Sequence, residues 1–213
     1  MLEFYCQHFR TVELNSTFYR LPAPGMAERW NESTPDDFCF AVKGSRFLTH
    51  MKKLKDPEAG ITRFFEPLAG LGSKLGPILF QLPPFWDADP VRLEAFLTML
   101  PSGHRYAFEM RNPTWHNPEI QDILRRHNAA FCIFEIAGFR SPVDLTADFT
   151  YIRLHGPGGA YQGSYSTADL SRWAGQIQEW KSELKGVYIY FDNDQMAYAA
   201  HNALSLECLL QKS

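Results

Sequence analysis

Short apolar runs alternate along the chain with polar or glycine-bearing turns and with stretches of helical periodicity. Each run is rich in β-branched or aromatic residues and is bounded by turn formers, which is typical of strands. Because the runs are apolar on both faces, they favour parallel strands that are covered on each side by helices. The expected strands are residues 11–15, 38–43, 77–82, 106–111, 130–135, 149–155 and 186–192.

The segments between these runs carry helix signals. Asp89 and Asn117 each precede a proline, a pairing that places an N-cap before the first helical residue. Ser166 and Asp169 form an acidic variant of a capping box at the start of another helix. Apolar residues also recur with helical spacing in residues 91–100 and 196–210. Alternation of strands and helices indicates right-handed βαβ units, and without a proline- or serine-rich linker we expect one domain spanning residues 1–213.

The polar residues distinguish a closed barrel from an open sheet. Nearly every predicted strand becomes polar at its carboxyl end. An open sheet concentrates such groups at one switch point, whereas a (β/α)8 barrel collects them around one mouth. The sequence therefore predicts an α/β protein of the TIM (β/α)8 barrel type. Residues 2–9 have helical spacing with no strand before them, so we expect about seven parallel strands in an N-terminally short barrel that lacks its first strand.

Composition narrows the function classes. A hydrophobic content of 45% and a charged content of 21% argue against disorder. A net charge of −3 makes nucleic acid or a membrane surface an unlikely partner on global charge. No leader and no long apolar span is present, which predicts a cytoplasmic location. The cysteines are far apart and form no C-x-x-C pair, so we expect neither disulfides nor a zinc site.

Charged residues two apart in the predicted strands define the candidate chemistry. Residues with this spacing point to the same face of a strand, and the intervening residues are apolar. Three such pairs should therefore point into the barrel, namely Glu13 with Asn15, Glu109 with Arg111, and Arg153 with His155. Burying these groups costs several kcal/mol each unless they are paired. They form either a functional cluster or a structural layer of ion pairs.

The residue types suggest acid–base chemistry on an anion. Arg111 and Arg153 can grip a carboxylate or phosphate through paired hydrogen bonds. Glu13 or Glu109 can act as a general base, and His155 can move a proton near neutral pH. These carboxylates and His155, with Asp192, also match a mixed metal site, but the two arginines compete for the carboxylates. We expect no metal.

Three loops add candidates, each with a plain alternative. Residues 43–55 are basic and can attract anions to the mouth, or they form a solvated loop. Residues 155–165 combine glycines and tyrosines, as in a lid over a polar ligand or an ordinary long turn. They lack the spacing of a nucleotide-binding motif, so no cofactor is expected. Trp115 either reaches the mouth or packs in the core.

Five motifs together resemble the YecE-like family (domain of unknown function 72). They are residues 11–19, 81–84, 109–115, 153–156 and 190–193. The resemblance implies a TIM-barrel fold and a bacterial cytoplasmic protein. Two features depart from the family pattern: the opening Gly-Thr-Ser-Gly-Trp-like loop is absent, and Asp192 stands where asparagine is expected. The motif residues expected to bind substrate are Asn15, Tyr19, Lys43, Gln81, Arg111, Trp115, Arg153, Asp192 and Asn193.

The sequence thus favours an enzyme that acts on a small polar anion, phosphorylated or resembling a sugar acid. Its expected catalytic residues are Glu13, Glu109 and His155. A non-catalytic module that binds a small metabolite is the alternative, and a nucleic-acid processing factor is a weaker one. The sequence does not indicate the oligomeric state.

Overall fold

The computed structural model describes residues 2–211 and divides the chain into two compact units. Unit 1 comprises residues 1–129 and unit 2 comprises residues 130–213. Every predicted strand is present, and the seven main strands are parallel to their sequence neighbours within each unit. No eighth parallel strand occurs among residues 2–211, in agreement with the expected strand count.

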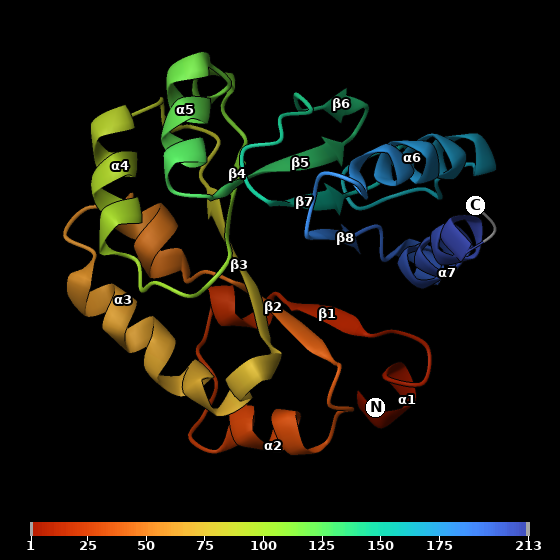
Figure 1. Cartoon of the computed structure of the whole chain (residues 1–213), viewed down its shortest axis with the longest axis horizontal. Helices are drawn as coiled ribbons and strands as arrows, with labels where there is room; N and C mark the ends of the chain where they lie inside the picture. Colours follow the sequence, from red (N-terminus) through yellow and green to blue (C-terminus); the bar gives the residue numbers. More distant parts are fainter. Residues whose placement is uncertain (1, 212–213) are drawn as a thin grey trace. The chain divides into compact units, whose positions relative to one another are not determined.

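Unit 1 contains four parallel strands, β1 (Thr11–Leu14), β2 (Cys39–Lys43), β3 (Leu75–Leu82) and β4 (Tyr106–Met110), in sequence order (Figure 1). The register places Gln81 opposite Glu109 and Lys43 opposite Leu79. The polar residues at the carboxyl ends of β2, β3 and β4 therefore lie along one edge of this sheet.

The helices of unit 1 follow their strands. Asp89 and Asn117 accept hydrogen bonds from the backbone of the first helical turn, as their sequence context predicts. The expected helix over residues 2–9 is shorter, because it ends at Tyr5 and continues as a turn. The elements are α1 (Leu2–Tyr5), η1 (Ser16–Phe18), α2 (Met26–Glu32), the π-helix η2 (Phe47–Met51), α3 (Glu58–Phe65), η3 (Glu66–Lys74), α4 (Pro90–Met99), η4 (Pro113–Trp115) and α5 (Pro118–Arg126).

Aromatic packing fixes which way the strand residues point in unit 1. The ring of Phe80 lies 5.0 Å from that of Phe96 on α4 and 5.4 Å from that of Phe108 on β4. Complete burial of a phenylalanine side chain contributes about 1.5–3 kcal/mol. Because side chains alternate along a strand, the helix-facing phenylalanines turn Gln81 and Glu109 to the opposite face of the sheet.

Unit 2 contains three parallel strands, β5 (Ala130–Ile136), β7 (Phe149–Leu154) and β8 (Gly186–Phe191). The sequence did not predict β6 (Phe139–Arg140), which pairs with β5 in an antiparallel hairpin. Its turn consists of Ala137 and Gly138, both with positive φ, as a two-residue hairpin of the primed type requires.

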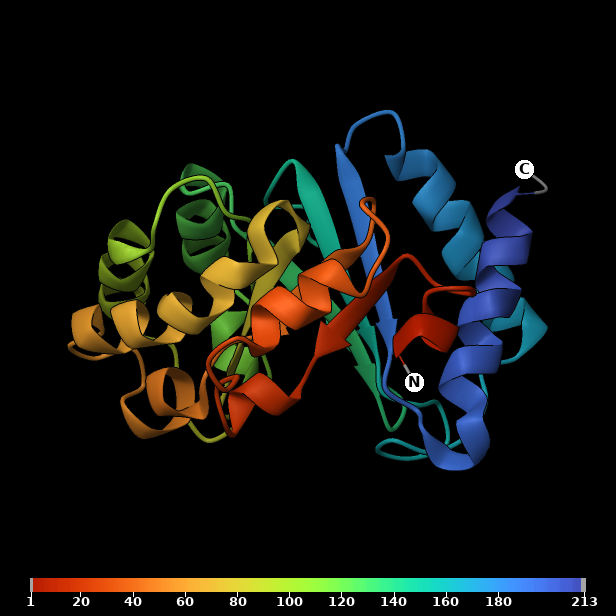
Figure 2. The ribbon, with the colours of Figure 1, turned by 90° about the horizontal axis from the view of Figure 1, so that it is seen from below.

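Two helices accompany the strands of unit 2, α6 (Thr167–Trp180) and α7 (Tyr198–Gln211), with the short η5 (Gln195–Ala197) between β8 and α7. The two long helices lie side by side (Figure 2). The expected capping box of Ser166 and Asp169 is present at α6. In α7 the buried residues are Asn202 and Leu206, so the expected broad apolar face is narrower than its sequence suggests.

The structure bears on two other expectations. No helix among residues 2–211 is long and apolar enough to cross a membrane. Cys6, Cys39, Cys132 and Cys208 are free thiols in this structure.

Candidate functional site

Unit 1 places a charged pair at the end of β4. Glu109 is completely buried, and its Oε1 accepts a hydrogen bond of 2.5 Å from Arg111 Nε. The side chain of Arg111 keeps 18% of its surface exposed. This contact orients the guanidinium of Arg111. Glu109 thus acts here as the group that positions Arg111.

The segment after β2 brings further cations to this part of unit 1. Lys43 Nζ lies 4.8 Å from the ring centroid of Phe18, and the imidazole of His50 meets the same ring edge-on at 5.0 Å. Burial lowers the pKa of His50, and the charges of Arg46, Lys43 and Arg111 lower it further. The imidazole is therefore neutral at pH 7, because three cations and a buried position oppose its protonation. We call Lys43, Arg46, His50, Glu109 and Arg111 the unit 1 cluster.

The other predicted residues of unit 1 occupy different environments. Glu13 is half-buried on β1 and faces Ala41 in the register. Asn15 precedes η1 but its side chain does not cap that helix. Gln81 is buried at the end of β3. Tyr19 is 79% exposed and lines a separate cavity, which is described below.

Trp115 packs in the core of unit 1. It is completely buried, and its Nε1 donates a hydrogen bond of 2.7 Å to the carbonyl oxygen of Trp86. The two indole rings meet at 4.9 Å. With its donor used and its surface covered, Trp115 has no face to offer a substrate. Of the two alternatives in the sequence, the structure favours packing.

Unit 2 places three charged or ionisable residues together at the ends of β7 and β8. Arg153 and His155 are both buried, with 1% and 0% of their surfaces exposed. Arg153 Nη2 donates to Asp192 Oδ2, and His155 Nδ1 lies 3.2 Å from the same oxygen. Arg153 Nη1 lies 3.4 Å from His155 Nε2. We call Arg153, His155 and Asp192 the unit 2 cluster.

These contacts suggest the tautomer of His155. Arginine has donors only, so Nε2 of the imidazole serves as the acceptor toward Arg153. The proton then resides on Nδ1, the nitrogen that faces Asp192. Burial raises the pKa of the neighbouring Asp194, and the charge of Asp192 raises it further. The unit 2 cluster therefore contains a buried guanidinium, a carboxylate and a histidine in one set of contacts.

The glycine-rich segment after β7 is held by several hydrogen bonds. Gly156 N–H donates to the hydroxyl of Tyr165 at 3.1 Å, and Tyr161 N–H donates to the carbonyl of His155 at 2.5 Å. Gly156 has a φ of +107°, and a Cβ there would lie 2.3 Å from the carbonyl oxygen of Gln162. Asn193 is buried and donates to the carbonyl of Gly163 at 2.8 Å. Asn193 thus ties this segment to the end of β8.

Across the part of the chain that the structure describes, no group of three or more His, Cys, Asp or Glu side chains is placed to hold a metal ion.

Parallel strands that alternate with helices, and carry charged groups at their carboxyl ends, define an α/β protein of the TIM-barrel type. A family model described as "Protein of unknown function DUF72" matches residues 1–213, and the chain belongs to this family. Both the predicted family and the predicted fold class are confirmed.

Two curated relatives illustrate the similarity. The UPF0759 protein YecE of Escherichia coli (strain K12) is 36% identical over 113 residues, which cover 53% of this chain and 42% of YecE. The match thus spans less than half the length of that relative. The UPF0759 protein YunF of Bacillus subtilis (strain 168) is 26% identical over 98% of this chain and 86% of YunF.

Solved structures of the family share the fold. A DUF72 family protein from Thermotoga maritima MSB8 (TM1631) is 28% identical, with a TM-score of 0.84 over 95% of this chain and 85% of the other. A DUF72 family protein from Enterococcus faecalis V583 (EF0366) has a TM-score of 0.86 at 20% identity, and the match covers all of this chain and 89% of the other.

The predicted site residues thus form two groups. Lys43, Glu109 and Arg111 are associated in unit 1, and Arg153, His155 and Asp192 are associated in unit 2. The expectation that all of them share one cavity stays a prediction. His50 and Arg46 were not predicted individually, although both belong to the basic segment of residues 43–55.

Proposed function

We propose that this protein is an enzyme that performs acid–base chemistry on a small polar anion, phosphorylated or resembling a sugar acid. The observation that carries the proposal is the unit 1 cluster, in which the buried Glu109 holds the Arg111 guanidinium, and Lys43 and His50 both contact the ring of Phe18. The unit 1 cluster therefore concentrates positive charge even though His50 is neutral. Binding of an anionic group offsets this charge.

In the unit 1 cluster, the two kinds of cation have different roles. Arg111 is fixed by Glu109 and presents a planar guanidinium, which suits paired hydrogen bonds to a carboxylate or phosphate. Lys43 supplies a more mobile point charge. Asn15 and Gln81 can add neutral hydrogen bonds. The substrate is therefore held mainly through its anionic group.

The unit 2 cluster supplies the proton transfer. Histidine is the side chain whose ordinary pKa lies nearest to neutral pH, which makes His155 the candidate acid–base group, and Asp192 Oδ2 lies 3.2 Å from its Nδ1. Arg153 holds Asp192 in place. Glu13, which is half-buried on β1, is the proposed general base.

A substrate screen with three variants tests this function. The protein is assayed on phosphorylated sugars and sugar acids, and Lys43→Gln, His155→Asn and Lys55→Gln are compared with the parent. We expect Lys43→Gln to raise KM about tenfold or more, because it removes a cation that contacts substrate, and His155→Asn to lower kcat by about 100-fold or more. Lys55→Gln is the matched control, since it removes an exposed charge from the same segment.

The outcomes separate the enzyme from the binding module. If the parent binds these anions by calorimetry but converts none of them, the protein is the module and the enzyme proposal is wrong. If Lys55→Gln weakens binding as much as Lys43→Gln, the anion is attracted by general charge and the unit 1 cluster is not its site.

A further inference from the structure

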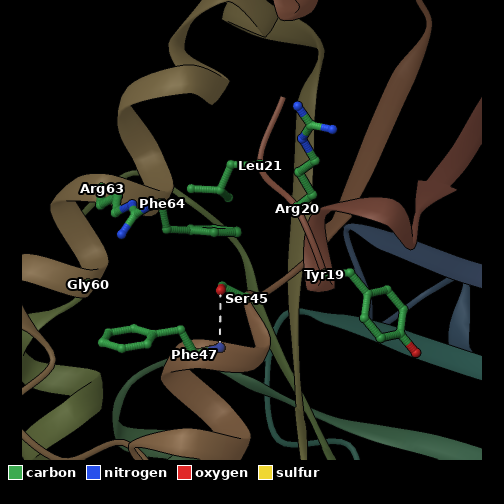
Figure 3. Close-up of a pocket in the computed structure, with 8 residues that line it drawn as sticks. All are labelled: Tyr19, Arg20, Leu21, Ser45, Phe47, Gly60, Arg63 and Phe64. Atoms are coloured by element: carbon green, nitrogen blue, oxygen red, sulfur yellow. Dashed lines mark hydrogen bonds between the residues drawn. The ribbon is translucent and has the colours of Figure 1, made fainter. Parts of the chain in front are cut away.

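A cavity lies in unit 1, outside the unit 1 cluster. It has a volume of about 400 Å³ and is lined by the loop before α2, the turn after β2 and the helix α3 (Figure 3). None of the unit 1 cluster residues lines it. We call it the outer pocket, and its lining residues used below are Leu21, Ser45, Phe47, Arg63 and Phe64.

Part of the wall of the outer pocket is apolar. Phe64 is buried on α3, Leu21 is half-buried, and the ring of Phe47 is 41% exposed. Figure 3 shows the rings of Phe64 and Phe47 on one side of Ser45, with Leu21 beyond Phe64. Cavities of a few hundred Å³ with aromatic walls and few polar groups are typical of small-molecule sites. The volume accommodates one ring or a short aliphatic group with a polar head.

The polar groups of the outer pocket are donors. Ser45 Oγ accepts a hydrogen bond of 3.2 Å from Phe47 N–H, which leaves its hydroxyl proton available for an acceptor in the cavity. Among residues 2–211, no carboxylate lies within 4.0 Å of the guanidinium of Arg63 or Arg20. Arg63 belongs to the α3 wall, whereas Arg20 is directed away from Ser45 (Figure 3).

We propose that the outer pocket binds a small organic anion, a carboxylate or a phosphate monoester that carries an aromatic or short aliphatic group. Arg63 and the Ser45 hydroxyl bind the anionic oxygens, and Phe47, Phe64 and Leu21 surround the apolar group. No acidic residue lines the cavity, and Lys52 Nζ lies 5.9 Å from the ring centroid of Phe47. The local charge therefore favours an anion over a cation or a neutral ligand.

The outer pocket and the unit 1 cluster share one stretch of chain. Ser45 and Phe47 line the pocket, whereas Lys43, Arg46 and His50 belong to the cluster. Part of this stretch is the π-helix η2, and such helices are rare and often occur at functional sites. The proposal does not depend on the function proposed above, because the two sites have different ligating residues.

Backbone NMR of the full chain tests the outer pocket with four defined probes: phenyl phosphate, benzoate, benzyl alcohol and inorganic phosphate. We expect phenyl phosphate or benzoate to shift the amide signals of Ser45, Gly60 and Phe64 in a saturable manner. Benzyl alcohol and inorganic phosphate should bind at least tenfold more weakly, because benzyl alcohol lacks the anionic group and inorganic phosphate lacks the apolar group. Whichever of phenyl phosphate and benzoate binds more tightly shows whether the pocket prefers a phosphate ester or a carboxylate.

Three variants complete the test. Arg63→Gln should weaken binding of the better probe about tenfold or more, and Leu21→Trp should block it by filling the cavity without changing the charge. Arg125→Gln is the matched control, since it removes an exposed arginine from α5. Absence of saturable shifts at the three amides overturns the proposal, and so does an equal loss of affinity in Arg63→Gln and Arg125→Gln.

Discussion

Replacement of Arg153 by methionine tests the unit 2 cluster most directly. The substitution keeps a long apolar side chain in a site that is 99% covered, and it removes the guanidinium that contacts Asp192. Asp192 keeps only 15% of its side-chain surface exposed, so water cannot fully replace the lost partner. The variant therefore leaves a largely buried carboxylate with His155 as its remaining partner in the cluster.

The expected loss follows from the burial of the pair. Breaking a buried ion pair by removal of one partner costs about 3–5 kcal/mol. The residual exposure of Asp192 and its contact with His155 place this case at the lower end, at about 3 kcal/mol. In a chain of 213 residues, each kcal/mol lowers Tm by about 2–4 °C, so Tm should fall by about 6–12 °C.

Urea unfolding followed by circular dichroism measures this change, with the slope m checked to confirm a common transition. The double variant Arg153→Met with Asp192→Asn should recover at least about 2 kcal/mol, because it removes both charges together. Arg172→Met, at a half-exposed ion pair on α6, should cost less than about 1 kcal/mol. If the double variant is as unstable as the sum of the two single variants, the cluster is not a coupled ion network.

Three further predictions concern other sites. Inorganic phosphate or a bound substrate should raise the pKa of His50, because an anion offsets the charges that lower it, and NMR titration of the imidazole reports this shift. Burial raises the pKa of Glu135 above 4.5, so the unfolding free energy falls as the pH rises from that value. Tm measured from pH 4 to 7 should show this loss of stability in the parent, and Glu135→Gln should remove it. Ser166→Ala breaks the capping box and should lower the unfolding free energy by about 1 kcal/mol in urea titrations.

Local sequence patterns predict the strands and the helix starts because their causes are local. The apolar runs are strands since both of their faces are covered, and Asp89, Asn117 and Ser166 cap helices through contacts three residues away. The same logic predicts that Arg153 and His155 point to one face, and both are buried together. The alternation of side chains along a strand is enough to predict which face of the strand a charged residue occupies.

Features that depend on tertiary contacts could not be predicted in this way. The strand β6 has only two residues, too few to show any periodicity. Trp115 lies in a motif beside charged residues, and its place in the core depends on a hydrogen bond to the carbonyl of Trp86, 29 residues away in the sequence. The outer pocket is formed by three segments that are separate in the sequence. Within its own segment, Phe64 looks like an ordinary core residue. Its existence depends on how these segments pack.

The charge balance of the two clusters explains why they suit different tasks. In unit 1, the charges of Lys43, Arg46 and Arg111 all act on His50, and Glu109 accepts a hydrogen bond from Arg111. That environment stabilises an added negative charge and disfavours an added proton. In unit 2, the charge of Arg153 is met by Asp192, and the same carboxylate lies beside His155. The unit 2 cluster therefore balances one cation against one anion, whereas the unit 1 cluster contains three cations and one carboxylate, which supports the proposal that the anion binds in unit 1.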